Sequence, residues 1–149
     1  MFEQKAVIVM QNLLKDFPGF TELDAAAIVG NLGHESGGFA LLQEINPVGG
    51  GQGGYGWAQW TGPRRKAFMN WSNQHNLTPS SDEANYGFLV YELKGPESAA
   101  IFATKNASGL YNKVVAFEKK FERAGVKSYA SRVNYAQRAL AAYNEKKNI

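Results

Sequence analysis

Apolar residues recur every three or four positions along most of the chain, which is the spacing of amphipathic α-helices. The pattern predicts helices over residues 3–15, over roughly residues 21–36, and from Pro63 to about residue 75. It predicts further helices from Ser80 to Gly95, from Pro96 to about Thr104, from Ser108 to Gly125, and from Ser128 or Ser131 through Tyr143. Proline near the start of a segment and glycine at its end are typical helix boundaries.

The segment 37–62 interrupts this pattern. Six of the residues between positions 49 and 56 are glycine, and a regular helix cannot persist through so many glycines. We expect loops here, with room for a short hairpin. The sequence therefore predicts a mainly α fold (α+β) of six or seven helices with one small glycine-rich β/loop lobe, and a cleft between the two parts.

One domain over residues 1–149 is the default for a chain of this length. Hydrophobic residues make up 44% of the 149 positions, which is enough to bury a core. No internal repeat, low-complexity stretch or interdomain linker divides the sequence.

Glu35 lies at the end of an apolar helical stripe. Thr21, with Asp24 three residues later, forms the reciprocal capping pattern that opens a helix. Ile28, Leu32 and Glu35 follow at i, i+4 and i+7, so they share one face of that helix. Since the first two must face a core, we expect Glu35 to point inward as well, and the following Ser-Gly-Gly to end the helix.

This position favours a protonated carboxyl. Desolvation and the negative end of the helix dipole both disfavour the charged form, so we expect a raised pKa for Glu35. A general acid that protonates a leaving oxygen needs such a carboxyl near neutral pH. The alternative is a structural glutamate, hydrogen-bonded at a helix C-terminus, and helix position alone leaves both open.

The turn from Gly54 to Thr61 is rich in side chains that stack on sugar rings or hydrogen-bond their hydroxyl and N-acetyl groups. Tyr55, Trp57, Gln59, Trp60 and Thr61 are the candidate substrate-binding residues. The alternative is that the aromatic residues pin a glycine-rich loop to the core. Together with an inward carboxyl, this turn suggests the cleavage of a glycosidic bond.

Charge and composition narrow the choice of partners. The net charge is +3, and the basic residues are spread along the chain, so the stripe typical of nucleic-acid binding is missing. A mildly basic chain suits an anionic polymer such as cell wall, or simply an ordinary soluble surface. With two histidines and no cysteine, a zinc site is improbable, and we expect no metal and no cofactor.

No apolar run approaches the length of a membrane span, so we expect no membrane insertion. The N-terminus lacks the cationic leader and cleavage site of a secretory signal. We therefore expect synthesis in a cytoplasm without a signal peptide, and delivery to any target outside the membrane by another protein.

Two motifs carry a resemblance to a known family. They are Gly30-Asn31-Leu32-Gly33-His34-Glu35-Ser36-Gly37 and Gly54-Tyr55-Gly56-Trp57-Ala58-Gln59-Trp60-Thr61-Gly62-Pro63-Arg64-Arg65. A helix that ends in Glu-Ser-Gly, followed by Gly-Tyr-Gly-x-x-Gln, resembles the lysozyme-like superfamily, including goose-type lysozymes and lytic transglycosylases. The fuller strings are most similar to phage tail lysozymes, and weaker similarity continues through residues 117–125 and 132–136.

The resemblance implies a muramidase that acts on the glycan strands of peptidoglycan. It places the catalytic glutamate at Glu35, and the tyrosine and glutamine of the substrate cleft at Tyr55 and Gln59. We expect a monomeric phage lysin, delivered to the wall by a holin or a phage particle.

A second carboxylate is harder to find. Glycosidases usually need one as nucleophile or as base, but Gly54 stands where hen-type lysozymes have an aspartate. The one acidic residue between Glu35 and Asp82 is Glu44, whose spacing of nine from Glu35 is similar to that in phage-type lysozymes. Glu44 is therefore the second candidate catalytic residue, and an exposed loop charge is the alternative. Without it, positioned water or the C6 hydroxyl of the substrate must attack, the latter giving a lytic transglycosylase.

Other functional classes remain open from sequence. A lysozyme fold without catalysis could anchor a particle to cell wall, and a helical structural protein of a phage particle is a third reading. The Arg64-Arg65 pair could grip carboxylates of peptidoglycan, or it could simply lie at a solvated helix start.

Overall fold

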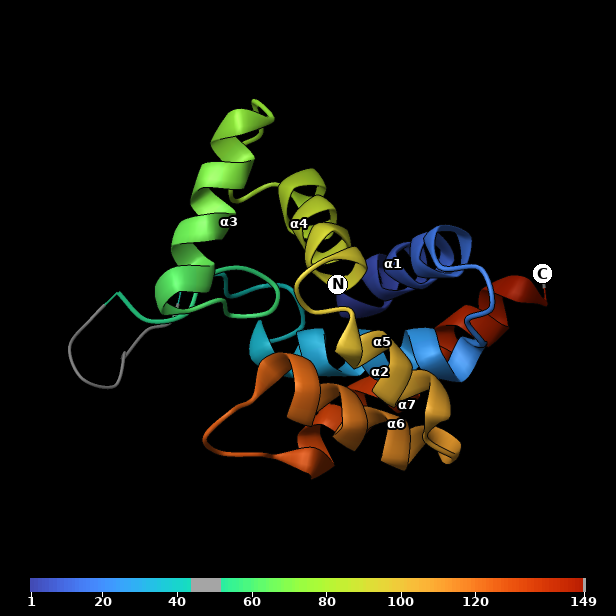
Figure 1. The fold of residues 1–149 in the computed structure, drawn as a ribbon. Helices are drawn as coiled ribbons and strands as arrows, with labels where there is room; N and C mark the ends of the chain where they lie inside the picture. The colour runs from blue at the N-terminus through green and yellow to red at the C-terminus, as the bar shows by residue number, and fades with distance from the viewer. Residues whose placement is uncertain (44–51, 149) are drawn as a thin grey trace.

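Helices account for most of the residues described by the computed structural model, which covers residues 1–43 and 52–148 (Figure 1). The α-helices are α1 (Phe2–Asp16), α2 (Glu22–Glu35), α3 (Gly62–Gln74), α4 (Asp82–Lys94), α5 (Ala99–Asn106), α6 (Gly109–Phe117) and α7 (Tyr129–Lys147). One π-helical turn, η2 (Glu118–Glu122), continues α6. The prediction of a mainly α fold is confirmed.

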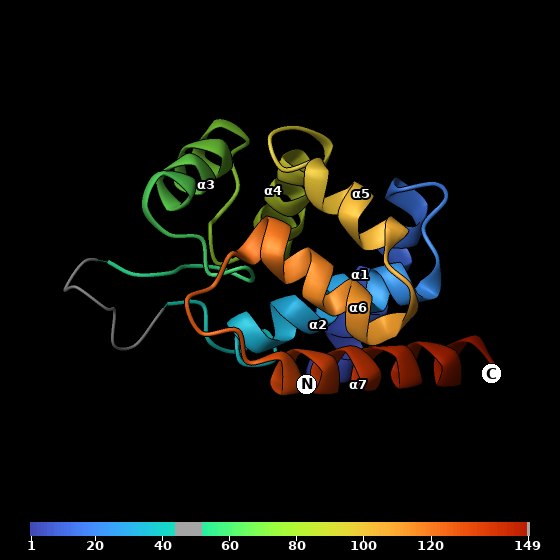
Figure 2. The ribbon, with the colours of Figure 1, turned by 60° about the horizontal axis from the view of Figure 1, so that its bottom comes forward.

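The second helix, α2, lies at the centre of the molecule. It packs against α7, α6 and α1, and Figure 2 shows α7 running along one side of it with α6 on another. Every residue from Asp24 to Gly33 is buried. The stripe of Ile28 and Leu32 is thus part of a helix that is enclosed on nearly all sides, which a single apolar stripe did not predict.

Two glycines of α2 allow this close packing. A Cβ atom on Gly30 would lie 2.5 Å from the Cβ of Ala136 on α7, and one on Gly33 would lie 2.9 Å from the rings of Phe2 and Tyr135. Real side chains do not approach so closely, so the bare backbone at these positions lets α1 and α7 reach the surface of α2. The approach of α7 brings its first turn beside the end of α2.

The predicted helix boundaries agree with local hydrogen bonds. Thr21 and Asp24 form the expected capping box, with distances of 3.2 Å and 2.8 Å. Ser81 caps α4 by accepting a hydrogen bond from the backbone of Ala84 at 3.1 Å. Pro63 lies in the first turn of α3. These ends depend on neighbours in sequence, which is why the sequence alone predicts them.

The glycine-rich lobe forms little regular structure. In its described part, the backbone pairing consists of single bridges between Gln43 and Tyr55 and between Tyr55 and Trp60. The predicted helix over 108–125 also differs, because it widens into the π turn η2 and ends at Arg123, whose φ of 51° is left-handed. Within the described ranges, none of the helices combines the length and the apolar character that a membrane span requires.

Candidate active site

Glu35 is the last residue of α2, and its carboxyl group faces an arginine. Its side chain is 16% exposed, and its Oε2 lies 2.6 Å from an Nη atom of Arg132 on α7. The sequence predicted the inward stripe but not this cation. A positive charge at this distance favours the ionised carboxyl, whereas burial favours the neutral one. The raised pKa expected for Glu35 therefore stays a prediction.

Arg132 has fixed partners on every side. Its side chain is 1% exposed, its Nη1 donates to Oδ1 of Asn31 at 3.1 Å, and its Nε donates to the carbonyl of Lys127 at 2.6 Å. Asn31 in turn donates to the carbonyls of Ala27 and Val114. A buried charge is tolerated only with such partners, so this network orients the guanidinium toward Glu35.

The turn after Glu35 leads the chain toward the glycine-rich lobe. Ser36 ends α2 by donating its hydroxyl to the carbonyl of Leu32 at 2.7 Å and accepting from the backbone of Phe39 at 2.9 Å. Gly37 and Gly38 have φ values of 58° and 71°, where glycine is unstrained. The predicted helix stop is confirmed, and the chain reaches Leu42 directly afterwards.

Gln59 holds the lobe against this turn. Its Nε2 donates to the carbonyl of Leu42 at 2.8 Å and to that of Gly56 at 2.9 Å, and its own φ is 54°. Tyr55 and Trp60 exchange backbone hydrogen bonds of 2.9 Å across the tight turn. Gln59 thus has a structural role that the sequence did not reveal, beside its predicted role in substrate binding.

The aromatic residues of this turn differ in accessibility. Trp57 is 3% exposed and Trp60 is 1% exposed, so neither presents a ring face to solvent, and the loop-pinning interpretation fits their packing. Tyr55 is partly exposed, with the Arg65 guanidinium 5.3 Å from its ring centre, and Thr61 is exposed just before α3. Substrate binding by all four stays a prediction, and the geometry favours Tyr55 and Thr61.

Arg64 is part of a second ion-pair network. Its Nε and Nη2 donate to both carboxylate oxygens of Glu92 at 3.0 Å and 2.7 Å, and its Nη1 donates to the carbonyl of Phe121 at 2.7 Å. Trp60 donates its Nε1 to Glu92 at 2.7 Å. Arg64 is thus paired with Glu92 and is not simply solvated at the helix start, whereas the grip of the Arg64-Arg65 pair on substrate carboxylates stays a prediction.

Glu122 lies between the two arginine networks. Its side chain is half-buried, and its Oε2 is enclosed without a hydrogen-bond partner among the described residues. Burial raises its pKa well above the usual range, and the charge of Glu35 adds to this, while Arg132 and Arg64 act in the opposite direction. The protonated form of Glu122 is therefore favoured close to Glu35.

The loop that leads into α7 is organised by Glu118. This buried carboxylate accepts hydrogen bonds from the backbone of Ala124, from Lys127 and from the hydroxyl of Tyr129, all between 2.8 Å and 3.0 Å. Burial opposes ionisation of Glu118, but these hydrogen bonds outweigh it and lower its pKa. The loop is thereby fixed in the conformation that presents the Lys127 carbonyl to Arg132.

The views in Figures 1 and 2 agree on where these parts meet. The end of α2, the segment 52–61 and the loop between η2 and α7 lie at one end of the molecule. The sequence model of the phage tail lysozyme family matches residues 4–143. The chain belongs to the phage tail lysozyme family. A comparison with curated proteins found no match.

Family membership indicates a lysozyme-like role in degrading peptidoglycan. In this phage tail lysozyme family member, the carboxyl at the end of α2 is the predicted catalytic residue, and the structure adds Arg132 and Glu122 beside it. A signal for Arg132 existed in the sequence, since it shares an i, i+4, i+7 stripe with Ala136 and Ala139, all buried on α7. Glu122 had no comparable signal, because a π turn does not follow that spacing.

Glu44, the second predicted catalytic residue, lies outside the described residues. Among the residues described, no cluster of three or more potential ligands could hold a metal ion.

His34 bonds Oγ of Ser131 at 2.8 Å through its Nδ1, and its pKa is lowered by burial and by the charge of Arg132. A charged His34 is thus disfavoured beside the site.

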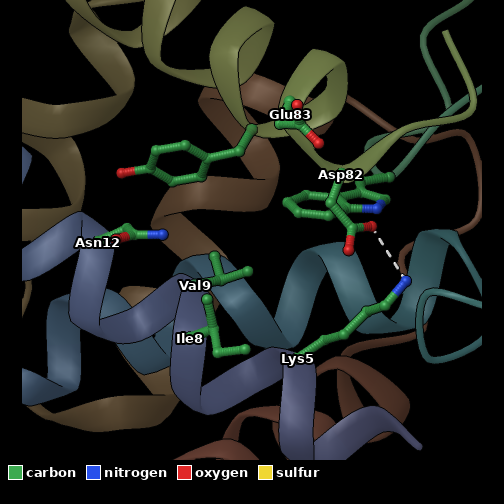
Figure 3. A pocket seen from close by; sticks show the side chains of 8 residues that line it. Lys5, Ile8, Val9, Asn12, Asp82 and Glu83 are labelled. Carbon is green, nitrogen blue, oxygen red and sulfur yellow. Dashed lines mark hydrogen bonds and ion pairs between the residues drawn. The ribbon is translucent and has the colours of Figure 1, made fainter. Parts of the chain in front are cut away.

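A pocket of about 270 Å³ lies elsewhere, between α1 and α4 (Figure 3). Trp57 borders it, and an ion pair of 3.0 Å between Lys5 and Asp82 lies at its edge. Its lining residues are Lys5, Ile8, Val9, Asn12, Trp57, Asp82, Glu83 and Tyr86. Glu35 is not among them, so this pocket is separate from the candidate active site.

Proposed function

We propose that the protein is a muramidase that cleaves the β-1,4 bond between MurNAc and GlcNAc in peptidoglycan, with Glu35 as general acid. The observation that carries this proposal is the position of Glu35. Its carboxyl lies at the end of the central helix, is partly exposed, and adjoins the lobe that carries the family motif. A carboxyl in this setting can touch a substrate, which an enclosed one cannot.

In the proposed reaction, Glu35 gives its proton to the oxygen of the leaving sugar as the glycosidic bond breaks. Tyr55, Gln59 and Thr61 orient the sugar through hydrogen bonds and ring contact. As base, Glu44 takes a proton from the water that attacks the anomeric carbon, and solvent returns a proton to Glu35. As nucleophile, Glu44 bonds to the anomeric carbon as the leaving sugar departs; water, giving its proton to Glu35, then breaks that bond and supplies the hydroxyl of the new reducing end.

A lytic transglycosylase is the second candidate. Glu122, a carboxyl near Glu35 in the described structure, has an enclosed Oε2, and burial raises its pKa well above the usual range. A carboxyl that keeps its proton cannot act as a base, so this favours a site in which Glu122 is not the second catalytic carboxyl. In a transglycosylase, the substrate's own C6 hydroxyl attacks and a 1,6-anhydro ring forms.

Mass spectrometry of digested peptidoglycan tests both candidates. We expect products with ordinary reducing ends, and a Glu44→Gln variant nearly as inactive as Glu35→Gln. An active Glu44→Gln protein that yields 1,6-anhydro-muramyl ends would make the protein a lytic transglycosylase. A wild-type protein that binds peptidoglycan without cutting it would show a binding module instead.

We also propose that the protein acts as a monomeric phage lysin that a holin or a phage particle delivers to the cell wall. The family match supports the connection to phage. Fractionation of infected cells and of purified particles would separate the two routes, since a virion-associated lysin stays with the particles.

A further inference from the structure

Arg132 reaches from the first turn of α7 to the carboxyl at the end of α2. The side chain is 1% exposed, whereas its partner Glu35 is 16% exposed, and the two meet at 2.6 Å. A fully buried arginine therefore ends on the carboxyl that the proposed function assigns as general acid and requires to be accessible.

Each donor group of this arginine has a different acceptor. Nε donates to the carbonyl of Lys127, Nη1 donates to Oδ1 of Asn31, and Nη2 lies against Oε2 of Glu35. The planar guanidinium fixes these three directions relative to one another. Because Asn31 belongs to the buried face of α2 and Lys127 to the loop held by Glu118, the third direction is fixed as well.

We propose that Arg132 is the positioning residue of this site, which holds the Glu35 carboxyl in place and sets the pH range in which it delivers a proton. The proposal rests on the proposed function of Glu35. It names a residue that acts through Glu35, without contact to the substrate.

The pH dependence follows from the groups that surround this arginine. Arg132 itself stays charged at all relevant pH values. The ionisable groups near the Arg132–Glu35 pair are His34 on α2, Glu122 on η2 and Tyr129 on α7. Arg64 on α3 and Glu92 on α4 act on Glu122 in turn, and Lys127 in the loop bonds Glu118. A permanent cation favours the carboxylate of Glu35, so a protein that lacks it should keep the catalytic proton to higher pH.

Kinetics over a range of pH on soluble peptidoglycan fragments test this role. In Arg132→Gln we expect the pH at which kcat falls on the alkaline side of the optimum to rise by about one to three units. We expect kcat at the optimum to fall by up to about a hundredfold, because a displaced acid is costly, with little change in KM. Arg132→Lys keeps a cation and should move this alkaline decline of kcat less. Arg138→Gln is the matched control, because Arg138 lies on the same helix as Arg132 and the variant breaks a 2.9 Å pair with Glu3 on α1.

A folded Arg132→Gln protein whose kcat has the wild-type value and the wild-type alkaline decline with pH would overturn the role of Arg132. If Glu35→Gln is inactive at the same time, the proposed function survives and only this inference fails; an active Glu35→Gln protein removes the proposed function itself.

Should both Arg132 variants fail to fold, the ¹⁵N signals of the Arg132 guanidinium decide. A change of these ¹⁵N signals with pH in the acid range that occurs in the wild type and is lost in Glu35→Gln supports the pair. The same change in both proteins overturns it.

Discussion

Arg64 and Arg132 form two ion pairs on either side of Glu122, and the two pairs are exposed in opposite ways. In the Arg64 pair, the arginine is 23% exposed and its partner Glu92 is 4% exposed. In the Arg132 pair, the arginine is 1% exposed and Glu35 is 16% exposed. The carboxylate is enclosed in the first pair and accessible in the second.

This difference separates structure from chemistry. Glu92 uses both oxygens on Arg64 and Trp60, so it joins α4 to the start of α3 and to the lobe. Glu35 has the same chemical group and the same type of partner, but it lies at the surface end of its helix. Accessibility of the carboxyl, and not the presence of an ion pair, distinguishes the candidate catalytic residue.

The largest expected effect is on catalysis at Glu35. Glu35→Gln should lower the rate of lysis by about 10²–10⁴, because the amide keeps the shape and loses the proton. Arg132 keeps Asn31, Lys127 and the amide oxygen as acceptors but loses the charge that balances it, so we also expect the free energy of unfolding to fall by about 3–5 kcal/mol. Turbidity assays on permeabilised cells, with thermal unfolding alongside, measure both. Activity above about a tenth of the wild-type value would remove Glu35 from the role of acid.

The enclosed pair should show the opposite behaviour. Glu92→Gln leaves the Arg64 charge without its carboxylate, and one acceptor oxygen remains where Arg64 and Trp60 used two, so the free energy of unfolding should fall by about 3–5 kcal/mol. The kcat of the folded fraction should stay within about twofold of wild type. Urea unfolding and active-fraction kinetics test this, and a large loss of kcat at unchanged stability would contradict the comparison.

Glu122, which lies between the pairs, should make stability depend on pH. Its pKa is raised in the folded state by burial, so the folded protein binds more protons than the unfolded one. Stability should then fall as pH rises above the unfolded value of about 4.3, by up to about 1.4 kcal/mol per pH unit, until the folded pKa is passed. Glu122→Gln should lose this dependence, so its stability relative to wild type should rise with pH. Parallel curves for the two proteins in urea unfolding would contradict the raised pKa of Glu122.

The smallest effects are expected in the lobe. Tyr55→Phe removes one hydroxyl and should slow turnover about two- to tenfold with little change in stability. Gln59→Ala removes two hydrogen bonds that hold the lobe and should also cost about 1–3 kcal/mol. Kinetics and thermal unfolding of both variants separate the two roles. If Tyr55→Phe loses stability while the folded fraction keeps full activity, Tyr55 packs the lobe and does not bind substrate.

Local patterns predicted the helices and the position of Glu35 because both depend on residues close in sequence. The Thr21–Asp24 capping box, the stripe of Ile28 and Leu32, and the glycine stop after Ser36 all lie within one helix and its ends. The periodicity did not reveal that α2 is enclosed on nearly every side, since that depends on where α1, α6 and α7 pack.

The sequence by itself determined a mainly helical chain, a carboxyl at the end of an apolar stripe, and the motifs of the phage tail lysozyme family. Only the tertiary structure decided what surrounds that carboxyl. Arg132 lies 97 positions from Glu35 in the chain, and they meet because Gly30 and Gly33 let α7 approach α2. Whether an arginine is solvated or paired, and whether a carboxyl keeps its proton, depends on burial and on charges from distant segments, and no local pattern contains that information.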